Sequence, residues 1–144
     1  MAIKHVDFIT IREDLSVYEI DNGQIVKAKQ ILTDIIEGED KKGKYGNLGF
    51  QTVSHVISPE NMDVSNLELA SPEQVTNDDV IKDLNFKVKK QVINIYETED
   101  VIILIKPEIE KIRATNKKDK ENSPILRIRT GMDVNVIPKN PVRK

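Results

Sequence analysis

The two histidines are the first candidates for chemistry, because imidazole can act as a metal ligand or as a general base near neutral pH. His5 lies close to Asp7, and His55 follows Ser54 directly. A zinc site needs three or four closely spaced ligands. A catalytic serine needs its histidine on the same side, whereas neighbours on a strand point to opposite faces. We therefore expect both histidines to be structural or surface residues, and we expect no enzyme activity and no bound metal.

Gly43, Gly46 and Gly49 are spaced like the glycines of a phosphate-binding loop. The Walker pattern, however, requires Gly-Lys followed by Ser or Thr at the start of a helix, and here a strand is expected to follow. The Asp78-Asp79 pair also lacks the alternating oxygen ligands and central glycine of a calcium loop. The glycines therefore predict a flexible hairpin loop, and no cofactor is expected.

Basic residues in the second half of the chain are the strongest charge feature. On strands, Lys87 and Lys89 share one face, as do Arg127 and Arg129. Such rows can contact phosphates through charge alone, which makes nucleic acid a candidate partner. They can equally protect an exposed sheet edge, a common use of Lys. The candidate basic binding face consists of Lys87, Lys89, Lys90, Arg127 and Arg129.

The net charge of −2 hides an uneven distribution. Residues 1–57 contain seven basic and nine acidic residues, and residues 85–144 contain fourteen basic and eight acidic residues. The segment between them, residues 58–84, has seven acidic residues and a single lysine. The chain therefore joins a mildly acidic half to a basic half through an acidic connector.

The composition limits both the core and the location. The chain has 144 residues with no Cys, no Trp, three Phe and three Tyr, so disulfides and a large aromatic platform are excluded. The start of the chain lacks a signal-peptide pattern, and the longest apolar run, Val101 to Ile105, is too short to span a bilayer. We expect a β-branched core, no membrane contact and, by default, a cytoplasmic location.

Two similar segments indicate an internal duplication. Val17-Tyr18-Glu19 resembles Ile95-Tyr96-Glu97 with an offset of 78 positions, and without a gap this offset also pairs Ile25 with Ile103 and Ile31 with Ile109. In each half a polar loop follows, residues 39–46 and 116–124, and then a further strand. The alternative is a chance match between two Ile-rich strands. We predict two copies of a three-stranded meander with a long, bent middle strand.

Residues 24–37 can be interpreted as helix or strand. Ala28, Ile31, Leu32 and Ile35 have helical spacing, which favours an amphipathic helix. The duplication places Pro107 in the matching segment, and proline inside a helix costs about 3 kcal/mol or more. The strand interpretation is therefore preferred.

Shorter elements complete the expected order. Residues 6–11 and 15–20 are expected to be strands, and the Asn22-Gly23 step predicts a tight turn. Ser71-Pro72 has the cap and first-turn proline of a helix start, and Asn77 to Asp79 can cap a further helical turn that ends near Leu84.

The fold class expected from these patterns is all-β, with about six to eight strands in one barrel or sandwich. Two meanders related by approximate two-fold symmetry bury their apolar faces against each other. The first repeat covers residues 1–57, the acidic connector with short helices covers residues 58–84, and the second, basic repeat with a C-terminal tail covers residues 85–144.

The lack of a catalytic constellation predicts a non-catalytic interaction or assembly module, with a protein partner or a second copy as its target. A structural component of a larger particle such as a virion fits this class. A nucleic-acid-binding β-barrel is the alternative, and a hydrolase or metal enzyme built on His55 is third. The tail has no core of its own, so we expect it to dock on a neighbour through Pro138, Lys139, Pro141, Arg143 and Lys144.

Overall fold

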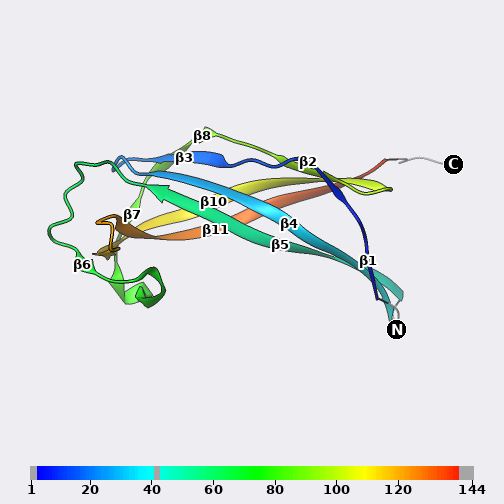
Figure 1. Cartoon of the computed structure of the whole chain (residues 1–144), viewed down its shortest axis with the longest axis horizontal. Helices are drawn as coiled ribbons and strands as arrows, with labels where there is room; N and C mark the ends of the chain where they lie inside the picture. The colour runs from blue at the N-terminus through cyan, green and yellow to red at the C-terminus, as the bar shows by residue number, and fades with distance from the viewer. Residues whose placement is uncertain (1–2, 41–42, 140–144) are drawn as a thin grey trace.

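A computed structural model describes residues 3–40 and 43–139 and shows a mainly β protein of two packed sheets (Figure 1). Sheet A contains β1 (Ile3–His5), β3 (Ser16–Ile20), β4 (Ile25–Asp40), β5 (Gly43–Ile57) and β8 (Phe86–Lys90). Sheet B contains β2 (Ile9–Arg12), β6 (Glu68–Leu69), β7 (Val80–Leu84), β9 (Asn94–Glu97), β10 (Val101–Lys118) and β11 (Pro124–Pro138). The expected all-β fold class is confirmed, and the architecture is a sandwich.

The only helical pieces in the described part of the chain are two 3₁₀ turns, η1 (Pro72–Gln74) and η2 (Asn77–Asp79). None of the helical segments that the structure describes has the length and apolar character required to cross a bilayer.

Apart from β6, which pairs with the end of β10, both sheets have the same strand order around their long middle strand. In sheet A, β4 pairs with β5 along one side and with β3 and then β1 along the other, and β8 lies beyond β3. In sheet B, β10 pairs with β11 along one side and with β9 and then β7 along the other, and β2 lies beyond β9. The meanders β3–β4–β5 and β9–β10–β11 thus occur in the expected order, one in each sheet.

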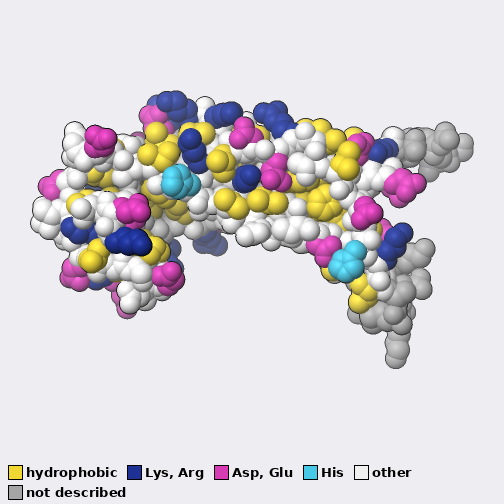
Figure 2. Space-filling view, viewed as in Figure 1, with side chains coloured by type: hydrophobic (Ala, Val, Ile, Leu, Met, Phe, Trp, Pro, Cys, Tyr) yellow, Lys and Arg dark blue, Asp and Glu magenta, His cyan; other side chains and the backbone are white. Residues whose placement is uncertain are grey.

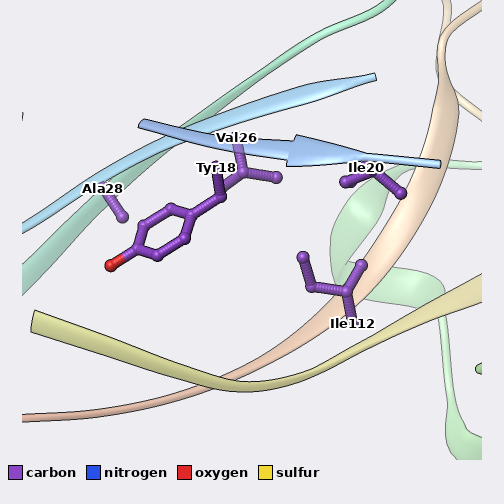
Figure 3. Packing of buried hydrophobic residues seen from close by; sticks show 5 residues of the cluster. All are labelled: Tyr18, Ile20, Val26, Ala28 and Ile112. Atoms are coloured by element: carbon purple, nitrogen blue, oxygen red, sulfur yellow. The ribbon is translucent and has the colours of Figure 1, made fainter. Parts of the chain in front are cut away.

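The core consists of two apolar clusters between the sheets. The first combines residues of sheet A with Ile112 of sheet B, and Figure 3 shows Tyr18, Ile20, Val26 and Ala28 on one side facing Ile112 on the other. The second combines Leu32 and Ile35 of sheet A with Tyr96, Ile103 and Ile105 of sheet B. Alternating burial along β3, with Ser16, Tyr18 and Ile20 buried, follows from the period-two geometry of a strand.

The preference for strand over helix in residues 24–37 is confirmed, because β4 runs from Ile25 to Asp40. A β-bulge lies between Leu32 and Asp34 and bends the strand, and β10 has a bulge between Ile109 and Lys111. Both expected middle strands are therefore long and interrupted by a bulge.

Pro107 is tolerated in β10 because one side of the strand has no neighbouring strand there. β9 pairs with β10 only as far as Ile105, and β7 begins pairing at Ile112. The nitrogen and carbonyl of one residue face the same side of a strand. The carbonyl of Pro107 accepts hydrogen bonds from Tyr18 and Gln91 in this gap, so the missing N–H of proline leaves no donor unsatisfied.

Strands β2 and β8 are exchanged between the halves, because each lies in the sheet formed by the meander of the other half. β2 pairs with β9 through Ile9–Glu97, Thr10–Tyr96 and Arg12–Ile95, and β8 pairs with β3 through Lys87–Glu19, Val88–Tyr18 and Lys90–Val17. Each residue of the first set lies 78 positions along the chain from its counterpart in the second set. In both sets one residue is left out of the pairing, and it is at the corresponding position. Residues 9–12 therefore complete the sheet of the second half, and residues 87–90 complete the sheet of the first.

The gap-free alignment of the two halves was wrong along the middle strands. Tyr18 lies opposite Val26, but Tyr96 lies opposite Ile103 rather than Leu104. The physical reason is that the β9–β10 turn is one residue shorter than the β3–β4 turn, so the matching buried residues of β4 and β10 are 77 positions apart. Val26 matches Ile103, and Gln30, rather than Lys29, matches Pro107. A duplicated origin of the two halves remains a prediction.

The expected helical turn ending near Leu84 was wrong. Ser71 and Thr76 do cap the two 3₁₀ turns. Val80–Leu84, however, forms β7 and pairs with β10, because the β-branched Val80 and Ile81 favour a strand beside an available edge. The end of the expected connector thus belongs to sheet B.

The expected loops are also shorter than the composition indicated. β4 continues to Asp40 and β5 begins at Gly43, so the predicted glycine hairpin loop lies within β5. In the second half β10 extends to Lys118. Polar residues continue these strands because long hairpin pairing satisfies their backbone groups without a core.

The single strand expected for residues 6–11 was also wrong. The chain forms β1 in sheet A, then crosses to sheet B and forms β2. Val6 and Phe8 pack against the second core cluster at this crossing, and the amide of Val6 donates to the carbonyl of Ile35. Because Val6 and Phe8 of the connecting segment are both core residues, their alternation resembles that of a strand.

Candidate interaction cleft

A cleft of about 790 Å³ opens between the two sheets at the end of the sandwich that carries β1. Figure 2 shows a recess at this end of the molecule. Sheet A provides β1 and the β4–β5 hairpin, and sheet B provides the β9–β10 turn and the end of β11. The apolar residues of its lining include Val6, Phe8, Ile35, Leu48, Val101 and Val136. The cleft therefore continues the second core cluster out to solvent.

Acidic residues surround this apolar lining. Among the residues that the structure describes, five carboxylates and two lysines, Lys4 and Lys139, line the cleft. Lys139 forms an ion pair of 2.7 Å with Glu97. The other four carboxylates form no ion pair among the described side chains, and they are Asp7, Glu37, Glu99 and Asp100. The cleft thus combines an apolar surface with an excess of negative charge.

The turn that carries two of these carboxylates is held in one conformation. The Thr98 hydroxyl accepts hydrogen bonds from the amides of Asp100 and Val101, at 3.1 and 3.0 Å. The amide of Thr98 also donates to the carbonyl of Val101 at 2.9 Å. Glu99 and Asp100 are therefore exposed at the tip of a structured turn.

The amide of Lys139 donates to the carbonyl of Asp100 at 2.9 Å, which ties the end of β11 to the same turn. Of the expected docking tail, Pro138 ends β11 and Lys139 lines the cleft. Pro141, Arg143 and Lys144 lie outside the described residues. The described part of the tail thus ends at the cleft.

The five residues of the expected basic face are divided between two edge strands. Lys87, Lys89 and Lys90 belong to β8 in sheet A, whereas Arg127 and Arg129 belong to β11 in sheet B. The structure does not bring them together into one strand row.

Each of these basic residues also has an intramolecular partner. Lys87 and Lys89 both contact Glu19, and Lys90 contacts Asp14. The hydrogen bond from Lys89, together with the charges of the two lysines, lowers the pKa of Glu19. Arg129 contacts Glu110 at 2.9 Å, and Arg127 donates to the carbonyl of Val75 and the amide oxygen of Asn77. Part of this positive charge is therefore paired with other residues of the same chain.

The two histidines lie on the surface and far apart in the fold. His5 is on β1, where its Nδ1 lies 3.0 Å from Asp34, and His55 is on β5 opposite Lys27. Both side chains are exposed. No three His, Asp or Glu side chains gather in a possible metal-binding group within residues 3–40 and 43–139.

The long outer strands β5 and β11 each pair on one side only, within the described part of the chain. Pro124 and Pro138 stand at the two ends of β11, which also carries Arg127, Arg129 and Asp133. Charges and prolines of this kind protect a free edge against pairing with another chain. β5 has neither a charged residue nor a proline from Asn47 to Ile57, so its free edge lacks this protection.

Sequence reasoning missed both the cleft and the exchange of β2 and β8 between the sheets. Phe8 and Phe86 are 78 positions apart, the same offset as Tyr18 and Tyr96, but this spacing does not show which sheet each segment joins. The cleft had no local signal, since its lining comes from five separate segments. Comparisons of the chain with protein-family models, curated proteins and solved structures give no match.

Proposed function

We propose that the protein is a non-catalytic assembly module that pairs with a second copy of itself through the free edge of β5. The observation that carries this proposal is the uncharged, proline-free stretch from Asn47 to Ile57 on a strand whose outer side has no partner among the described residues. Unpaired N–H and C=O groups on such an edge are a template for adding a strand.

Self-pairing fits the chemistry of β5 better than pairing with a charged peptide. An antiparallel pair of identical strands places each side chain opposite a residue of the same short segment, and like charges at such positions destabilise the pair. Gln51, Thr52 and Ser54 are exposed and uncharged. Two copies can therefore meet without repulsion and continue sheet A across the interface.

Light scattering on the purified chain tests this proposal. We expect a mass of twice 16.4 kDa at high protein concentration. The double variant Gln51→Lys/His55→Lys places lysines on exposed positions of the edge and is expected to return the mass to 16.4 kDa. Asn135→Lys, an exposed position on the other outer strand, is the matched control and is expected to remain dimeric.

Circular dichroism of each variant checks that the fold is intact. A wild-type chain that stays at 16.4 kDa at every soluble concentration would overturn the proposal. A dimer that survives the double substitution while Asn135→Lys disrupts it would place the interface on β11 instead.

A further inference from the structure

We propose that the cleft is the docking site of the chain's own C-terminal segment, Asn140 to Lys144. This inference rests on the cleft and is independent of the pairing of β5. The segment is thus the one occupant that we assign to the apolar surface between the ends of the two sheets.

The position of the chain end supports this assignment. Lys139, the last described residue, lines the cleft, and its amide is bound to the carbonyl of Asp100 at 2.9 Å. Five residues follow it in the sequence. An extended segment of five residues spans about 17 Å, which is long enough to reach from Lys139 into the cleft that Lys139 lines.

The chemistry of the segment complements the lining. Its residues are Asn140, Pro141, Val142, Arg143 and Lys144, which provide two apolar side chains and two cations. Val142 matches an apolar surface that includes Val6, Phe8 and Val101. Arg143 and Lys144 match the excess of carboxylates, since oppositely charged surfaces attract and fix the orientation of binding.

At the opposite end of the sandwich, hydrogen bonds join the two sheets. There, the side-chain amide of Gln24 donates to the hydroxyl of Ser58 and to the carbonyl of Pro124. Ser58 is also hydrogen-bonded to Ser123 at 2.6 Å. The start of the connector thus ties the β3–β4 turn of sheet A to the β10–β11 hairpin of sheet B. At the cleft, the C-terminal segment follows directly after Lys139, which belongs to the lining.

Nitrogen-15 relaxation on the full chain tests this assignment. At low salt we expect the heteronuclear NOE of Val142 and Arg143 to be close to that of Ile137. The variant Glu99→Lys/Asp100→Lys is expected to lower the NOE of these two residues, as is high salt, because the attraction is between exposed charges. Glu121→Lys, in the β10–β11 hairpin at the opposite end, is the control and is expected to leave them unchanged.

Amide shifts in a chain that ends at Lys139 give a second measurement. We expect the amides of Val6, Phe8 and Val101 to shift on truncation, and the peptide acetyl-Asn-Pro-Val-Arg-Lys to reverse these shifts. Unlabelled full-length protein, added at the same concentration as the labelled truncated chain, is expected to have no effect.

Two results would overturn the inference. An NOE for Val142 and Arg143 in the wild-type chain that is as low as in Glu99→Lys/Asp100→Lys would show that the segment does not dock. A shift of the cleft amides of the truncated chain caused by unlabelled full-length protein would assign the cleft to the tail of a second copy. Loss of the dimer in light scattering changes neither measurement, so failure of the β5 proposal is distinguishable.

Discussion

The hydroxyl of Tyr18 donates a hydrogen bond of 3.3 Å to the carbonyl oxygen of Pro107 and so links the two sheets at the centre of the sandwich. The side-chain amide of Gln91 donates to the same oxygen, also at 3.3 Å. The reciprocal bond runs from Asn94 of sheet B to the carbonyl of Gln30 in sheet A, at 3.2 Å. Gln30 and Pro107 lie at matching buried positions of β4 and β10. In each middle strand, a carbonyl therefore faces the gap between two neighbouring strands. A side chain from the other sheet donates a hydrogen bond to that carbonyl.

Removing the Tyr18 hydroxyl is expected to destabilise the fold modestly. Tyr18→Phe loses one buried hydrogen bond, worth about 1 kcal/mol, while Gln91 still satisfies the carbonyl of Pro107. Tyr18→Phe/Gln91→Ala leaves that carbonyl without a donor and should cost about 1 to 3 kcal/mol in total. Urea denaturation measures both changes. A double variant as stable as Tyr18→Phe would show that the carbonyl finds another partner.

Phe8 and Phe86 are expected to contribute similar free energies of unfolding. Phe8 packs edge-on against Tyr96 at 5.8 Å, and Phe86 packs edge-on against Tyr18 at 6.3 Å, so each exchanged segment anchors in the other half. Both are only partly buried, and Phe→Ala at either position should cost about 2 kcal/mol, below the value for a fully buried phenylalanine. Thermal unfolding of the two variants makes the comparison. A loss confined to one of them would mean that only one exchanged segment supports the fold.

The fold class could be predicted because strand patterns are local, whereas the exchange and the cleft are set by long-range contacts. Val6 and Phe8 alternate like strand residues, and nothing local separates a strand from two short strands that cross between sheets. The one-residue difference between the β3–β4 and β9–β10 turns shifts the register of β10, and the strand pairing shows this shift because Tyr96 lies opposite Ile103. The docking of the tail on a neighbour stays a prediction, and the cleft that Lys139 lines could not be predicted because it requires the two sheet ends to be placed in space.

The stability of the protein is expected to fall as the pH rises above about 10, the ordinary pKa of tyrosine. Burial raises the pKa of Tyr96, and so does its 2.6 Å hydrogen bond to the Glu13 carboxylate. The unfolded chain then releases a proton that the folded chain retains, so stability is complete below pH 10 and is lost progressively above it. Tyr96→Phe should be less stable than wild type at pH 8 but should lose less stability between pH 8 and 11. Urea denaturation at several pH values checks this, and equal pH slopes would contradict it.

Gly23 is expected to be the glycine that tolerates substitution least. Its φ of +95° lies in a region that L-residues rarely adopt, and a Cβ there would lie 3.1 Å from Cγ of Pro59. Gly23→Ala should therefore cost about 1 to 2 kcal/mol. Gly46→Ala is the matched control, because a Cβ at Gly46 has only the carbonyl oxygen of Ile36 nearby, at 3.8 Å, and its φ lies outside that region. Removing glycine at a compatible site stabilises by about 0.4 to 1 kcal/mol through the unfolded chain, so the two variants should move the urea midpoint in opposite directions. A midpoint for Gly23→Ala equal to that of wild type would show that the β3–β4 turn can adopt a conformation with negative φ.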